Sequence, residues 1–239
     1  MAQQTVLSVR GEARRMVAPD YATFRCGLRG GGSSKSDALE LVRQTQDAIV
    51  DALAQLGGTA LTPETGRAAL TWSVGTMSTH PVRKFDKGTG RSTLTGRVRA
   101  NAALLVVARD LALIDSVGQA LKQQDRLHIQ WIGWGVDEDN PQWRTVRADA
   151  IAAAIAKGSD YAVALGGSVR SVEHIADVGL LSGDPADHRM ATRDSVQALA
   201  PFSSGGGRTP SLDPVPQELH AVIEARLVAE VPTLTSDAT

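Results

Sequence analysis

Residues 17–30 read VAPDYATFRCGLRG, and this stretch sets the pattern on which the fold depends. Apolar side chains occupy every second position: Ala22, Phe24, Cys26 and Leu28. Pro19 and Asp20 precede the alternation, and such a pair is typical of a turn, although Asp20 could also serve as a general base. The stretch predicts a turn into a half-buried strand. Cys26, the only cysteine of the chain, is then expected in the core rather than exposed as a nucleophile.

Outward from this stretch, the pattern predicts an α+β fold with mainly antiparallel sheet, packed by about three helices. The expected order is β-β-α-β-β-α-β-α-β-loop-β. Strands are predicted at Thr5–Arg10, Tyr21–Arg29, Arg67–Met77, Leu94–Ala108, Arg126–Val136, Ser168–Leu180 and Glu218–Val231. Residues 80–91 are typical of a loop or hairpin tip. Residues 102–108 are apolar on both faces, which predicts a central strand covered on both sides.

Helix boundaries are marked by local chemistry. Ser34–Leu56 begins at a capping-box pattern and ends at a glycine pair, and Leu39, Val42, Ile49, Leu53 and Leu56 form its apolar stripe. Asp110 caps a second helix, whose residues Leu111, Ile114, Val117 and Leu121 are expected to face inward. Asn140 and Pro141 open a third helix that runs to Leu165. It is rich in alanine, which would let it lie close against a sheet or a neighbouring subunit.

The chain has 239 residues, of which 42% are hydrophobic, and this length permits a substantial core. We predict a single domain over residues 1–232 and a tail over 233–239. Residues 182–216 are rich in Gly, Pro, Ser, Asp and Arg without periodicity, which predicts one long loop inside that domain.

The charge balance and the termini limit the function classes. The formal net charge is -1, and the basic residues are scattered, although Arg97, Arg99 and Arg109 are fairly close together, so we expect no nucleic-acid binding. The longest strongly apolar run, 102–108, is far shorter than the ~20 residues that a membrane-spanning helix needs. No export signal is visible at the N-terminus, which predicts a cytoplasmic protein.

Few patterns point to chemistry. Residues 29–36, RGGGSSKS, join a strand to a helix as a phosphate loop would, but Arg29 and Ser34 stand where that motif needs glycine. The histidines lack metal-ligand spacing; a site from Asp184, Asp187 and His188 is possible in principle, but a solvated loop is preferred. Trp131 and Trp134 are expected on opposite faces of a strand, one in the core and the other at a subunit surface or a ligand. We therefore predict no catalytic, cofactor-binding or metal-binding residues.

Four segments in succession resemble the SIMPL-domain family, which includes bacterial periplasmic immunogenic proteins and stress-related homologues. They are VLSVRGEARRMVAPDYATFRCGL (6–28), LTGRVRANAALLVVARDLALI (94–114), RADAIAAAIAKGSDYAVALGGSVRSVEHIAD (147–177) and PQELHAVIEARLVAEV (216–231). Arg97 stands where the family often has an aromatic residue, and Pro216-Gln217 where it tends to have Pro-Gly. Many members also carry an export signal. The resemblance implies an α+β fold, ring-like or hollow oligomers in some relatives, and no established catalytic residues.

These observations predict a non-enzymatic, self-assembling homo-oligomer with a scaffold-like or stress-related role. Its expected association surfaces are sheet edges, alanine-rich helix faces and the loop at residues 183–216. The alternative is a small-molecule or anion-binding module that uses residues 30–36 or the Trp131 and Trp134 region. An enzyme assembled from distant segments is a third possibility that the sequence leaves open.

Overall fold

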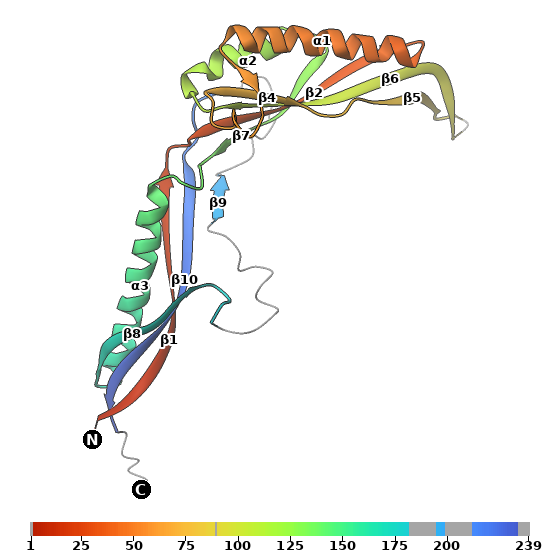
Figure 1. Ribbon diagram of the computed structural model, residues 1–239. Coiled ribbons are helices and arrows are strands. Elements are labelled where there is room, and N and C mark those ends of the chain that lie inside the picture. The colour runs from red at the N-terminus through yellow and green to blue at the C-terminus, as the bar shows by residue number, and fades with distance from the viewer. Residues whose placement is uncertain (1, 89, 182–194, 199–211, 234–239) are drawn as a thin grey trace. The chain divides into compact units, whose positions relative to one another are not determined.

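The computed structural model describes residues 2–88, 90–181, 195–198 and 212–233, which form two compact units. The first unit comes from the described residues of 1–18, 137–199 and 216–239, and the second from those of 19–136 and 200–215. Each unit has a sheet with helical structure on one face (Figure 1). The predicted α+β class is therefore confirmed, while the predicted single domain stays a prediction.

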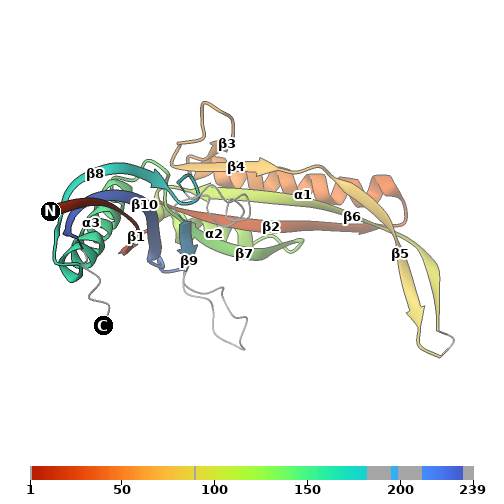
Figure 2. The same cartoon turned by 90° about the horizontal axis from the view of Figure 1, so that it is seen from below.

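The second unit contains a six-stranded sheet. Its strands are β2 (Tyr21–Gly32), β3 (Thr59–Ala60), β4 (Leu70–Val74), β5 (Ser78–Asp86), β6 (Arg91–Ala108) and β7 (Leu127–Gly135). The order is β3-β4-β6-β2-β7, and β5 also pairs with β6. Strand β6 is long enough to pair with β5 along its first half and with β4 along its second half (Figure 2).

Helix α1 (Lys35–Gln55), the short turn η1 (Leu111–Leu113) and helix α2 (Ile114–Lys122) cover one face of this sheet. The predicted alternation is confirmed, because four side chains of β2 are fully buried there: Ala22, Phe24, Cys26 and Leu28. The predicted helical stripes are confirmed as well. Buried between sheet and helices are Val42, Ile49 and Leu53 of α1 and Ile114, Val117 and Leu121 of α2.

The helix ends follow the predicted local chemistry. The Ser34 side chain accepts a hydrogen bond from the Asp37 N–H, and the Asp37 carboxylate accepts one from the Ser34 N–H, which completes the capping box. At the other end of α1, Gly57 has a φ of 79° and donates to Ala54 O, while the next amide donates to Leu53 O. This pair of bonds is a Schellman motif, and only glycine adopts such a φ without strain.

The first unit is a smaller sheet covered by one long helix. Its strands are β1 (Ala2–Val17), β8 (Ser168–Asp177), β9 (Ser195–Ala198) and β10 (Gln217–Pro232), and its helix is α3 (Gln142–Ala164). Strand β10 is central, with β1 on one side and β8 and β9 on the other, all antiparallel. Odd-numbered side chains of β10, from Leu219 to Ala229, are buried on the face that packs against α3.

Helix α3 lies unusually close to this sheet because the side chains between them are small. A Cβ atom added to Gly11 of β1 would stand 2.1 Å from Ala150 O and 2.6 Å from Ala154 N. The contact stripe continues along the helix with Gly158 and Ala162. The alanines of this helix were predicted to lie against a sheet or a neighbouring subunit. Three of them, Ala150, Ala154 and Ala162, face the sheet of their own unit.

Several strand predictions were wrong. Strand β1 does not end at Gly11 but continues to Val17, because Gly11 serves close packing rather than chain reversal. Of the two alternatives predicted for residues 80–91, the hairpin is correct, but its strand β5, which pairs with β6 from Ser78 to Asp86, was not predicted. The residues at 195–198 form β9 within the predicted loop, whose segments 182–194 and 199–211 lie outside the described residues.

The central position of β6 was predicted correctly, but its coverage on both faces was not. Ala102, Leu104 and Val106 are buried under the helices, whereas Ala103 on the other face is exposed and Leu105 is half-buried. An all-apolar run therefore does not require two covering layers here.

We expect Gly11→Ala to destabilise the protein by about 2–3 kcal/mol, because the added methyl overlaps the backbone of α3. Urea denaturation followed by far-UV circular dichroism measures the change. The matched control is Gly31→Ala in β2, where the nearest atom to an added Cβ is Val98 O at 3.9 Å. Equal stability of the two variants would contradict the close packing of α3 on β1.

Candidate functional site

The face of the first unit's sheet that points away from α3, called the open face below, gathers charged side chains from all three long strands. Even-numbered residues of β10 lie on it, because side chains alternate along a strand. Their ion-pair partners come from neighbouring strands: Arg10 pairs with Glu224 at 3.1 Å, Arg14 with Glu218 at 3.4 Å, and Arg170 with Glu230. The open face is therefore a ladder of cross-strand ion pairs.

Glu224 is the buried member of this ladder, with 8% of the residue exposed. Its carboxylate accepts hydrogen bonds from Arg10 Nη2 at 3.1 Å and from the Leu181 N–H at 3.3 Å. The Leu181 carbonyl in turn accepts a bond from Arg226 Nη2 at 3.2 Å. These contacts hold the turn that follows β8 against the open face.

The environment keeps Glu224 ionised. Burial alone would raise the pKa of its carboxyl, but hydrogen bonds from Arg10 and from the Gly179 and Leu181 amides, together with the Arg10 charge, lower the pKa overall. A general acid that works near neutral pH needs the opposite shift. Glu224 is thus arranged to fix a turn rather than to transfer a proton.

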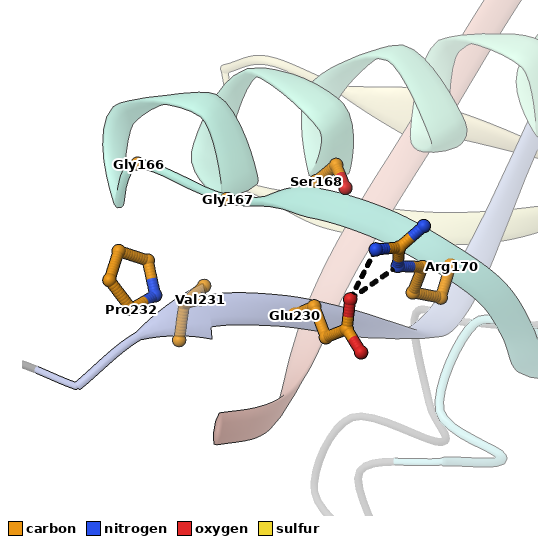
Figure 3. A pocket seen from close by; sticks show the side chains of 7 residues that line it. All are labelled: Gly166, Gly167, Ser168, Arg170, Glu230, Val231 and Pro232. Carbon is orange, nitrogen blue, oxygen red and sulfur yellow. Dashed lines mark hydrogen bonds and ion pairs between the residues drawn. The ribbon is translucent and has the colours of Figure 1, made fainter. Parts of the chain in front are cut away.

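An open pocket of about 580 Å³ lies where the turn from α3 into β8 meets the end of β10 (Figure 3). It is lined by Gly166, Gly167, Ser168, Arg170, Glu230, Val231 and Pro232. The only charged groups in this lining are Arg170 and Glu230, and Arg170 Nε donates to Glu230 Oε2 at 2.7 Å. Because these two charges satisfy each other, the lining offers neither a general base nor an uncompensated charge for a ligand.

Cys26 lies in the core of the second unit, as predicted, and its side chain is fully buried. Desolvation raises the pKa of its thiol to about 12. Since the thiolate is the reactive form of cysteine, Cys26 is inert at neutral pH.

The strand-to-helix junction at residues 30–36 uses its own side chains where a phosphate would bind. The Asp37 carboxylate accepts from Ser33 Oγ at 2.7 Å and from the Ser34 N–H at 3.1 Å, and these bonds lower the pKa of Asp37. Gly30 and Gly32 serve packing, because a Cβ at Gly30 would stand 2.4 Å from Ala38 O and a Cβ at Gly32 would stand 2.6 Å from Asp37 Cβ. The junction thus has a structural explanation without a bound anion.

The remaining candidates do not converge. Asp20 lies in the bend before β2, where its N–H donates to Gly135 O. Trp134 packs against the core, whereas Trp131 is 47% exposed and has the Arg25 guanidinium 6.0 Å from its ring centre, so the predicted division of the two tryptophans is confirmed.

The described histidines do not belong to any group of side chains that could bind a metal ion. Asn101 Nδ2 lies 3.4 Å from His80 Nδ1, Gln130 Nε2 lies 3.5 Å from His128 Nε2, and His220 Nε2 lies 3.7 Å from Glu12 Oε2. Within the described ranges, no three His, Cys, Asp or Glu side chains gather as metal ligands would. Asp184, Asp187 and His188 lie outside the described residues.

Sequence reasoning missed the pairing of Arg10 with Glu224. The signal was present in the charged residues at even positions of 218–230, but the partners of Glu218 and Glu224 stand more than 200 residues earlier in the chain. Only the register of β1 with β10 brings them together.

We expect Glu224→Gln to lower the free energy of unfolding by about 1–2 kcal/mol at pH 7, because it removes a charge-assisted hydrogen bond. A carboxyl with a lowered folded-state pKa contributes stability above its ordinary pKa of about 4.3, and this contribution is lost as the pH falls through the folded-state pKa. The stability difference between wild type and variant should therefore shrink from pH 7 toward pH 3 in denaturant titrations. Glu218→Gln, at a weaker and more exposed pair, is the control. A difference independent of pH would contradict this role of Glu224.

A comparison with known protein families identifies a family for most of the chain. The family model of SIMPL, described as a protein of unknown function (DUF541), matches residues 7–227. The match spans parts of both units. No protein with a curated description matches the chain. Because this match covers most of its 239 residues, the chain belongs to the SIMPL family.

Proposed function

We propose that this chain is a non-enzymatic, self-assembling protein with a scaffold-like role, and that strand β8 pairs with a second copy. The observation that carries the proposal is the state of β8 in the first unit. Among the described strands, β8 pairs only with β10, so its outer edge presents unpaired backbone groups. Such an edge is a ready template for another chain.

The side chains of β8 also favour a partner. Val172 stands opposite Leu227 and Ile175 opposite Ala225, and both β10 residues are buried under α3. Val172 and Ile175 point to the same face, yet they are 43% and 47% exposed. Helix α3 packs mainly on β1 and β10 and leaves Val172 and Ile175 of β8 exposed.

Burial of these two side chains would favour pairing of β8 with a second copy. Burying a whole Val or Ile side chain contributes about 1.5–3 kcal/mol, so covering these two half-exposed residues contributes about 2 kcal/mol per copy. Hydrogen bonds along the strand edge would add to this and fix the register. The predicted contribution of residues 183–216 to assembly falls mostly on residues outside the described ranges and stays a prediction.

The site chemistry supports a role without catalysis. Cys26 is buried with a raised pKa, Glu224 is fixed as an anion, and the pocket lined by Arg170 and Glu230 holds a satisfied ion pair. Each of these groups has a structural task in its own unit.

We expect the double variant Val172→Lys with Ile175→Lys to weaken self-association at least about tenfold, because edge lysines oppose strand pairing and both apolar contacts are lost. Light scattering coupled to size-exclusion chromatography at micromolar concentration measures the mass. The control is Val163→Lys on α3, a residue that is 69% exposed and not on the strand edge. A wild-type monomer, or a variant that assembles like wild type, would overturn the proposal.

A further inference from the structure

The β5–β6 hairpin stands clear of the second unit's core. Strand β6 and its partner β5 extend past the N-terminal end of α1 (Figure 2). Every residue from 83 to 97 whose side chain the structure describes is exposed. No buried contact within the unit therefore explains the side chains at this tip.

The hairpin concentrates positive charge. Between residues 78 and 99 the basic residues are Arg83, Lys84, Lys87, Arg91, Arg97 and Arg99, and the one acidic residue is Asp86. The whole chain has a formal net charge of -1, so this excess is local and not a property of the composition. An anionic partner would be attracted to this tip over about 8–10 Å at physiological salt.

Two large apolar side chains lie among these cations. The register pairs Arg83 with Leu94 and Phe85 with Ser92, which places Phe85 and Leu94 as diagonal neighbours on one face of the hairpin. They are 61% and 60% exposed. Arg83 shares the face of Phe85 and Leu94, and Lys84 lies at a position of the opposite face, so cations flank the apolar pair on both faces of the tip.

An irregularity separates this tip from the base of the hairpin. Pro81 pairs with Val98, but the next paired residues are Arg83 and Leu94, which leaves extra residues on β6. Gly96 accommodates them with a φ of 74°, and Thr95 Oγ1 donates to Val82 O at 2.9 Å. Such a bulge turns the strands locally and directs the tip independently of the sheet.

We propose that the hairpin tip binds the surface of an anionic lipid bilayer. Phospholipid headgroups would neutralise the cations, and Phe85 and Leu94 would enter the boundary between headgroups and acyl chains. The cations and the two apolar side chains of the tip would then each contact a matching part of the bilayer. None of the helices in the described part of the chain combines the length and the apolar character of a membrane span.

Two other possible partners of the hairpin tip account for fewer of its exposed side chains. A nucleic acid would supply phosphates for the cations, and its bases could stack on Phe85, but it would leave Leu94 without an apolar partner. The acidic face of α1 in a second copy is a weak counterpart, because Arg43 already binds Glu40 at 2.8 Å and Asp47 at 3.1 Å.

Flotation of the full chain with vesicles tests the proposal. Wild type should bind phosphatidylcholine vesicles that contain phosphatidylserine, should bind pure phosphatidylcholine vesicles much more weakly, and should lose affinity as sodium chloride is raised. The triple variant Arg83→Gln, Lys84→Gln, Arg91→Gln should bind on the order of 100-fold more weakly, since each cation near an anionic surface contributes about 1 kcal/mol. Phe85→Ser with Leu94→Ser should weaken binding about tenfold or more.

The matched control combines Leu61→Ser with Lys122→Gln, which removes an exposed apolar residue and an exposed cation elsewhere in the second unit, and it should bind like wild type. Far-UV circular dichroism confirms that every variant is folded.

Absence of vesicle binding, equal binding to neutral vesicles, or unchanged binding of the Phe85 and Leu94 variant would overturn the proposal. Binding to a single-stranded oligonucleotide in place of vesicles would identify the tip as a nucleic-acid surface instead. The Val172 and Ile175 variant separates this from self-assembly, because it should still bind anionic vesicles.

Discussion

Direct contact between helix backbone and sheet backbone is the constraint on which both units depend. In the first unit Gly11 lets the Ala150 carbonyl approach β1, and in the second Gly30 lets the Ala38 carbonyl approach β2. A side chain at either glycine would push its helix away from the apolar residues beneath it. Gly30 and Gly32, which resembled part of a phosphate loop, and Gly11, before which a strand was predicted to end, are thus explained by the same packing requirement.

The parts of the fold that depend on neighbouring residues could be predicted, and those that depend on distant ones could not. Alternation placed Cys26 in the core, and caps placed the ends of α1 correctly. The length of β1 and the existence of β5 were missed, because each is stabilised by a partner strand whose position the local pattern does not reveal. The pairing of the exposed Arg10 with the buried Glu224 was missed for the same reason.

Charges are handled differently in the two units. On the open face of the first unit, cations and carboxylates alternate between strands, so that the ladder is close to neutral and stabilises the sheet. On the hairpin of the second unit, cations stand together with one acidic residue among them. The net charge of the whole chain is near zero, but it does not distinguish the paired charges of the first unit from the excess of cations on the hairpin. The distribution of charge is therefore more informative about function than the total.

Strand β10 also imposes an order on biosynthesis. Its register joins Ala2 to Pro232, so the two ends of the described chain are neighbours in one sheet. A ribosome that adds about 5–20 residues per second needs ~10–45 s to travel from β1 to its partner. During that time most of the second unit emerges from the ribosome, while the backbone of β1 lacks its partner strand. The edge of the nascent first strand therefore stays open to pairing with other strands until β10 has been made.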